Sequence, residues 1–257
     1  AFCTIPAIKG PYRSFSGPAI LAEARHLVEQ GIQEIVLVAQ DSTAYGRDRG
    51  EEDGLAALIE SLLETAPGLS WLRLMYTYPG HITPRLIEVL SGSPQICPYI
   101  DLPLQHAHPA TLKRMGRPAD VEAVRTLLGR LRARIPDLVV RSTFIVGYPG
   151  ETEEEFAALR SFLQEQALER VGVFPYSCEE GTPAARLGER VPVEVAEARR
   201  DELLSLQQGP KAQRGPAERG IVQVPAQVIG EAQGGRQGVV GSRSRCRRRR
   251  FGAHWIV

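Results

Sequence analysis

The residues best placed to do chemistry lie in one segment, 141–152, which reads Arg-Ser-Thr-Phe-Ile-Val-Gly-Tyr-Pro-Gly-Glu-Thr. Gly147 and Gly150 remove side chains at a turn, so that a flat ligand could approach the backbone there. A plain turn between a strand and a helix also needs such glycines, and residue types alone leave both interpretations open. Thr152 and Glu155 form the Thr-x-x-Glu pattern of a capping box, which predicts that a helix begins at this point.

Thiol, imidazole and carboxylate groups elsewhere form no metal motif by spacing alone. His106 and His108 follow a predicted strand, and as a pair two residues apart they favour loop hydrogen bonding over ligation. The acidic run 151–155 favours complementation of a helix dipole over a metal site. Neither a disulfide framework nor a complete metal knuckle is indicated by the cysteines. They lie far apart in the chain, at Cys3, Cys97, Cys178 and Cys246.

An alternation of strand and helix patterns must position these residues. Apolar residues at helical spacing and short apolar runs alternate along the chain, and repeated units of this kind imply a parallel sheet. The apolar runs are nearly continuous, which predicts a sheet covered on both faces. An open doubly wound sheet and a barrel both fit. Strands are expected near 34–39, 71–76, 99–104, 138–146 and 171–176, and helices near 18–30, 55–63, 84–90, 121–134 and 153–166.

Polar and aromatic residues follow the predicted strands at the edge where such sheets bind ligands, which is the carboxyl edge. The candidate site therefore combines residues 40–41, 76–78, 105–106, 147–150 and 176–177.

Composition indicates a globular protein with one large core, because 43% of the 257 residues are hydrophobic and 24% are charged. This excludes a disordered or fibrous chain. The longest aliphatic run, 35–39, is far shorter than the roughly 18 residues of a membrane-spanning helix. The few scattered cysteines favour a reducing, cytoplasmic setting.

Charge divides the chain at Gln208. Residues 1–208 carry 21 basic and 28 acidic side chains, whereas residues 209–257 carry 10 and 2. The basic tail also has repeated glycines and no regular succession of strand patterns, so we expect it to be mostly disordered or the product of a frameshift. The chain begins with Ala1 rather than methionine, and we expect it to be a fragment with a missing upstream part.

Three stretches, taken together in their order and spacing, resemble the radical-SAM methylthiotransferases. They are 2–14, 101–118 and 143–152, and the likeness continues through 173–183 to about Gln208. The Gln-His-Ala-His stretch at 105–108 resembles the branch that modifies an aspartate of a small-subunit ribosomal protein. The tRNA-modifying branch typically has Gln-Ser-Gly-Ser there.

The resemblance implies an α/β fold, a partial (β/α)6 TIM-like barrel whose first strand is missing from this chain. In the family, a Cys-x3-Cys-x2-Cys loop after that strand holds a four-iron, four-sulfur cluster with one iron open to S-adenosylmethionine. Cys3 matches the third cysteine and Phe2 the aromatic residue before it, so the other two cysteines would precede Ala1. The core at 1–208 is then truncated at its start, and residues 209–257 stand in place of a TRAM domain.

The resemblance also assigns binding roles around S-adenosylmethionine. Gln40 takes the position near the methionyl group, Gln105 the ribose side, and Thr143, Ile145 and Gly147 the adenine motif. Thr143 stands where many radical-SAM enzymes have glycine. A second four-iron, four-sulfur cluster belongs to an N-terminal domain that would precede this chain.

The sequence therefore predicts a radical-SAM methylthiotransferase that adds a methylthio group to an aspartate of a small-subunit ribosomal protein, with this chain an inactive fragment. Its expected partners are that protein, the ribosome or RNA, and an electron donor such as flavodoxin or ferredoxin, and no membrane. One alternative is a tRNA adenosine methylthiotransferase of the same family. Another is a non-catalytic RNA-binding remnant that uses the arginine-rich tail, whose binding would depend on salt.

Overall fold

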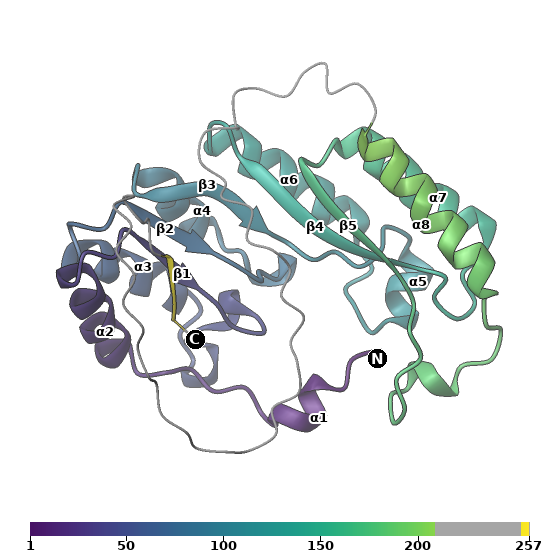
Figure 1. Cartoon of the computed structure of the whole chain (residues 1–257), viewed down its shortest axis with the longest axis horizontal. Coiled ribbons are helices and arrows are strands. Elements are labelled where there is room, and N and C mark those ends of the chain that lie inside the picture. Colours follow the sequence, from purple (N-terminus) through teal and green to yellow (C-terminus); the bar gives the residue numbers. More distant parts are fainter. Residues whose placement is uncertain (209–252, 257) are drawn as a thin grey trace, which may run out of the picture.

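The computed structural model describes residues 1–208 and 253–256 (Figure 1). Its centre is a parallel sheet in the order β5-β4-β3-β2-β1-β6, in which every pairing is parallel. The five strands expected from the sequence are all present, so the predicted α/β class is confirmed. The strands are β1 (Glu34–Leu37), β2 (Trp71–Leu74), β3 (Ile96–Asp101), β4 (Val139–Val146), β5 (Arg170–Pro175) and β6 (Ala253–Ile256).

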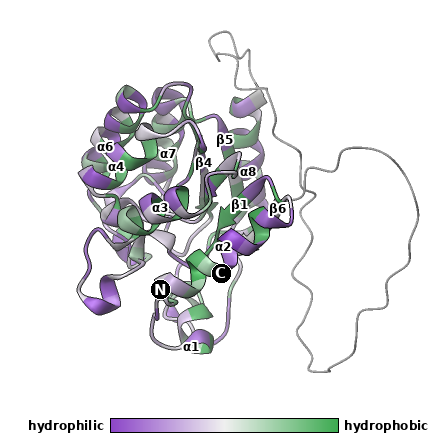
Figure 2. Ribbon diagram, turned by 90° about the vertical axis from the view of Figure 1, so that its left-hand side faces the viewer, coloured by the Kyte–Doolittle hydropathy of each residue, from purple (hydrophilic) through white to green (hydrophobic). Residues whose placement is uncertain are grey.

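Helices alternate with these strands, and the five expected from the sequence are confirmed. They are α2 (Gly17–Glu29), α3 (Gly54–Thr65), α4 (Pro84–Gly92), α6 (Val121–Arg134) and α7 (Glu153–Gln166). Three further helices were not expected: α1 (Ile5–Lys9), α5 (Pro109–Arg114) and α8 (Val193–Gln208). In Figure 2, α3, α4, α6 and α7 lie together on one side of the sheet.

The order of the strands explains why the helices share one side. From β1 to β5 each strand lies beside its predecessor in the sequence. Crossovers between parallel strands are right-handed, so a series that always steps in the same direction places every crossover helix on the same face. This arrangement is that of a barrel wall and not of a doubly wound sheet.

The expectation that both sheet faces are covered does not hold for β2 and β4, where burial alternates along the strand, whereas Ile35, Val36 and Leu37 of β1 are all buried. In β4, Phe144 and Val146 are fully buried against the helices, whereas Arg141, Thr143 and Ile145 on the other face are only half-buried. The inner face of a partial barrel has no helices to cover it. Half-buried polar side chains such as Thr143 can therefore stand on that face.

Strand β6 pairs with the edge of β1, with Glu34 opposite Ala253 and Leu37 opposite Ile256. It lies at the edge where the resemblance places the first strand of the barrel. Residues 253–256 form this strand within the tail that the sequence predicts to be mostly disordered. For residues 209–252 and 257 that expectation lies outside the described part of the chain and stays a prediction.

Within residues 1–208 and 253–256, no helix has the length and apolar character needed to cross a lipid bilayer.

Candidate active site

Gln105 anchors the centre of the candidate site by extending the sheet beyond β3. Its backbone N–H donates to the carbonyl of Thr143 at 2.8 Å, and its own carbonyl accepts from the N–H of Ile145 at 2.8 Å. The two bonds hold Gln105 at a φ of 72°, in the left-handed region that is costly for a residue with a Cβ atom. Backbone strain of this kind gathers at functional sites. The structure thus brings together three residues that the sequence predicted for one pocket.

A buried ion pair that sequence reasoning missed stands beside this extension. The guanidinium Nη1 of Arg141 lies 2.9 Å from Oδ1 of Asp101, a carboxylate without solvent exposure. The backbone N–H of Tyr76 donates to the other oxygen of Asp101 at 3.3 Å, and Tyr76 is itself at a φ of 55°. Burial raises the pKa of Asp101, although the Arg141 charge opposes that shift. The pair connects the end of β3 and the loop after β2 with the third residue of β4. The only sequence signal was an aspartate inside an apolar strand.

A second polar cluster follows β1 and β2. Nδ1 of His81 lies 2.7 Å from Oδ2 of Asp41, and the hydroxyl of Thr43 donates to the other carboxylate oxygen at 2.5 Å. The Thr43 hydroxyl also accepts from the backbone N–H of Tyr78 at 3.0 Å. The sequence singled out Asp41 only as a strand-end residue. The cluster fixes the two loops that border the inner face of the sheet.

Gly147 stands at the turn after β4, but its surroundings are protein. It has a φ of 70°, and a Cβ atom placed on it would lie 2.4 Å from the Cβ of Ala196 in α8. The close approach that requires glycine is therefore the packing of α8 against the turn. A role of Gly147 in cofactor binding remains a prediction, but a valine there would disturb the fold and cannot probe binding alone.

The acidic run after Gly150 forms ion pairs with separate cations. The Glu155 carboxylate contacts the guanidinium of Arg114 and accepts from the Thr111 hydroxyl at 3.0 Å. Burial works against ionisation of Glu155, but hydrogen bonds from Arg114 and Thr111 outweigh it and lower its pKa. Glu151 is fully buried and lies 2.7 Å from Nη1 of Arg199. Arginines thus contact two carboxylates of this run.

The start of α7 matches the predicted capping box. The Thr152 hydroxyl accepts from the backbone N–H of Glu155 at 3.3 Å, and the Glu155 carboxylate accepts from the backbone N–H of Thr152 at 3.2 Å. The two histidines also act as expected. Nδ1 of His106 accepts from the backbone N–H of His108 at 3.0 Å, and Nδ1 of His108 accepts from Ala110 at 3.3 Å.

Cys3 and Gln40 lie apart from the Gln105 group. Cys3 is exposed, and the neighbouring ring of Phe2 packs against Tyr148, which follows β4, at 6.4 Å between ring centroids. Gln40 is exposed after β1, two places from β3 in the sheet. In the described residues no hydrogen bond joins either side chain to Thr143 or Ile145.

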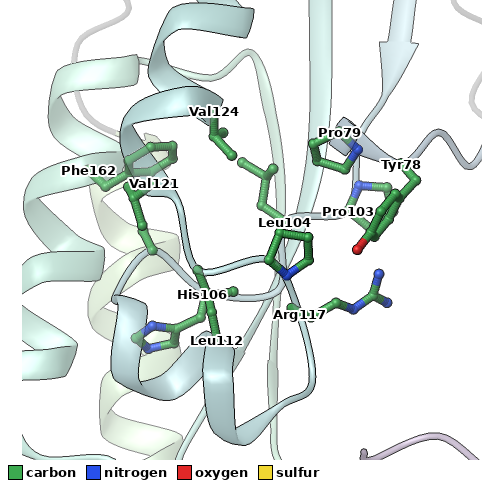
Figure 3. Close-up of a pocket in the computed structure, with 12 residues that line it drawn as sticks. Tyr78, Pro79, Pro103, Leu104, His106, Leu112, Arg117, Val121, Val124 and Phe162 are labelled. Carbon is green, nitrogen blue, oxygen red and sulfur yellow. The ribbon is translucent and has the colours of Figure 1, made fainter. Parts of the chain in front are cut away.

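A cavity of about 30 Å³ lies between the loop after β3 and helices α5 and α6. In Figure 3, Leu104, Leu112 and Val124 line it, with Tyr78 and Arg117 together at one end. Such a volume admits water-sized guests only. A nucleoside does not fit there.

Residues 1–163 match the model of the radical SAM superfamily, which is more than half of the chain. The chain belongs to the radical SAM superfamily. A solved relative of this fold is the radical S-adenosylmethionine methyltransferase TsrM of Kitasatospora setae with cobalamin and a [4Fe-4S] cluster bound. It aligns with a TM-score of 0.50 at 18% identity, over 62% of this chain and 31% of that one.

Among curated proteins, this radical SAM chain is similar to ribosomal protein uS12 methylthiotransferases named RimO. The chain is 56% identical over 208 residues to the RimO of Chloroflexus aurantiacus, and the alignment covers 81% of this chain and 46% of the relative. It is 51% identical over 237 residues to the RimO of a Roseiflexus species, and this alignment covers 92% of this chain and 50% of the relative. The chain thus spans about half the length of these relatives. The second alignment extends past Gln208, so the expectation that the likeness ends there is wrong.

A radical SAM fold implies an iron–sulfur cluster, and the described residues do not by themselves fit one. Three thiolates are needed to leave one iron open, but Cys3 stands without a second thiol partner there. In residues 1–208 and 253–256 no three His, Cys, Asp or Glu side chains are grouped so as to hold a metal ion. Cys97, the thiol inside β3, has a pKa raised to about 11 by burial, which disfavours the thiolate.

Proposed function

We propose that this chain is the radical-SAM core of a methylthiotransferase that modifies an aspartate of ribosomal protein uS12. The observation that carries the proposal is 56% identity over 208 residues to the uS12 methylthiotransferase of Chloroflexus aurantiacus. The proposal takes over the activity of relatives of which the chain spans about half the length. Residues 1–208 are the proposed core, and residues 209–257 are the proposed basic tail in place of a TRAM domain.

The proposed cofactors are S-adenosylmethionine and a four-iron, four-sulfur cluster to which Cys3 contributes one of three thiolates. A second cluster, an electron donor such as flavodoxin or ferredoxin, and a cytoplasmic setting belong to the same proposal. When bound, these cofactors supply the radical and sulfur chemistry, and the protein supplies position and shielding.

The chain's own residues supply the proposed binding site for S-adenosylmethionine. The hydrogen bonds of Gln105 with Thr143 and Ile145 fix the inner face near the carboxyl edge. The ion pair of Asp101 and Arg141 links the end of β3 to β4. We assign Gln40 and Gly147 to the flanks of the same pocket. A prearranged site of this kind orients ligands at little cost in entropy.

The test is a chimera in which residues 1–208 replace the matching segment of the Chloroflexus aurantiacus enzyme. We expect the chimera to cleave S-adenosylmethionine and to add a methylthio group to uS12, which mass spectrometry of the tryptic peptide detects. The Cys3→Ala chimera is the control and should do neither. Cleavage with modification of tRNA in place of uS12 would refute the substrate assignment, and a cluster-loaded chimera that cleaves no S-adenosylmethionine would refute the proposal.

A further inference from the structure

Arg117 occupies an unusual place between two aromatic rings at the carboxyl edge. Its guanidinium carbon lies 5.5 Å from the ring centroid of Tyr78, which follows β2, and 5.9 Å from that of Phe2, next to Cys3. Figure 3 shows Arg117 beside Tyr78, away from the apolar end of the cavity. The guanidinium thus connects the segment that carries Cys3 with the loop after β2.

The described part of the chain contains four other arginines stacked on rings, and each of them also pairs with a carboxylate. These pairs are Arg49 with Glu51, Arg73 with Glu34, Arg125 with Glu165 and Arg199 with Glu151. Among the described residues Arg117 has no ion pair and no side-chain hydrogen bond to a carboxylate. Arg117 is therefore the stacked arginine, in the part of the chain that the structure describes, whose N–H groups contact no carboxylate.

Stacking leaves those N–H groups available. A guanidinium that lies over ring faces keeps its hydrogen-bonding edge in the ring-free direction, and that edge matches a carboxylate in a bidentate geometry. The rings also restrict the side chain before any ligand arrives, which lowers the entropy lost on binding. Arg117 is half-buried, so an ion pair formed there is less weakened by solvent than one on the open surface.

We propose that Arg117 binds the side-chain carboxylate of the aspartate that the enzyme modifies. This inference rests on the proposed function. A carboxylate could also come from the methionyl group of S-adenosylmethionine, so the two sources are titrated separately. Arg117 is then a residue that determines specificity for aspartate over asparagine.

The experiment measures binding of fluorescent uS12 peptides to the complete 257-residue chain by anisotropy, without turnover. One peptide carries the target aspartate and the other carries asparagine at the same place. We expect the wild type to prefer aspartate by about tenfold or more, as for a charged hydrogen bond. Arg117→Gln should remove the preference, and Arg117→Lys should restore only part of it because lysine lacks the planar fork. Arg49→Gln, a stacked arginine with its own carboxylate, should keep the full preference.

Two further measurements separate the possible outcomes. Circular dichroism should show the same fold for Arg117→Gln and wild type. N-acetyl-aspartate amide and S-adenosylmethionine are titrated separately, with the Arg117 Nε–H followed by NMR. An aspartate preference that persists in Arg117→Gln overturns the inference, as does equal binding of both peptides by the wild type. So does a variant that loses affinity for S-adenosylmethionine alone. If neither peptide binds but N-acetyl-aspartate amide shifts the Arg117 resonance, the proposed substrate is wrong while the carboxylate site stands.

Discussion

Replacing Gly147 with alanine should destabilise the fold by about 2–5 kcal/mol, because two separate costs add at this position. The first is backbone strain, since Gly147 has a φ of 70° where an L-residue loses about 1–2 kcal/mol. The second is overpacking. The new methyl group would lie 2.4 Å from the Cβ of Ala196, and forcing α8 outward typically costs about 1–3 kcal/mol.

A matched substitution measures the backbone cost alone. Gly50 has a φ of 79° and nothing within 4 Å of a Cβ placed on it. Gly50→Ala should therefore lose only the strain component, about 1–2 kcal/mol. Urea unfolding followed by circular dichroism gives the free energy of each variant by linear extrapolation.

A double-mutant cycle with Ala196→Gly measures the steric component. That change removes the methyl group that the new side chain meets, at a cost of about 1 kcal/mol in helix propensity. The double variant should be more stable than the sum of the two single changes by about 1–3 kcal/mol. The packing argument is refuted if Gly147→Ala lowers the free energy of unfolding by no more than Gly50→Ala does. It is also refuted if the effects of Gly147→Ala and Ala196→Gly are additive.

Three other variants or treatments test the remaining reasoning. Arg199→Met should lower the free energy of unfolding in urea by about 3–5 kcal/mol, because it leaves the buried Glu151 carboxylate without its guanidinium. Arg160→Met removes an exposed ion pair and should change that free energy little. Equal effects of the two variants would contradict the distinction between buried and exposed pairs. The pKa of Glu155 is lowered from its ordinary 4.5, so its contribution is full above that pH and is lost as pH falls below it. Glu155→Gln should thus flatten the fall in unfolding free energy below pH 4.5, and an unchanged slope would exclude Glu155 as its source. Anaerobic reconstitution of residues 1–257 with iron and sulfide should yield no stable cluster, and about four irons per chain bound through Cys3 would overturn that expectation.

The sequence by itself determined those elements whose signals are local. These signals depend on residues a few positions apart in the chain. They are the helical spacing in α2 and α3, the apolar runs at the strands and the Thr152 capping box, and each of these elements has the predicted form. The strand-end position of Gln105 followed from the same logic, because carboxyl ends of neighbouring parallel strands meet at one edge, whereas Thr143 was singled out only by the family resemblance.

Helix α8 was not predictable in this way because its buried face is defined by the rest of the protein. The buried residues of that face include Ala196, Arg199 and Leu203, and an arginine in the stripe makes the sequence pattern look polar. Glu151, 48 positions earlier, supplies the carboxylate that pairs with the buried Arg199. Periodicity within one helix carries no information about such a partner.

The tertiary structure alone decided which contacts the site residues make. It placed the inner face of the sheet open and paired Asp101 with Arg141, 40 positions apart. It filled the space beside Gly147 with α8, so a glycine that suggested ligand approach serves helix packing. It also stacked Arg117 between two rings from distant segments. Each of these contacts joins groups that are far apart in the chain. Such groups come close together only after the strands have assembled in order.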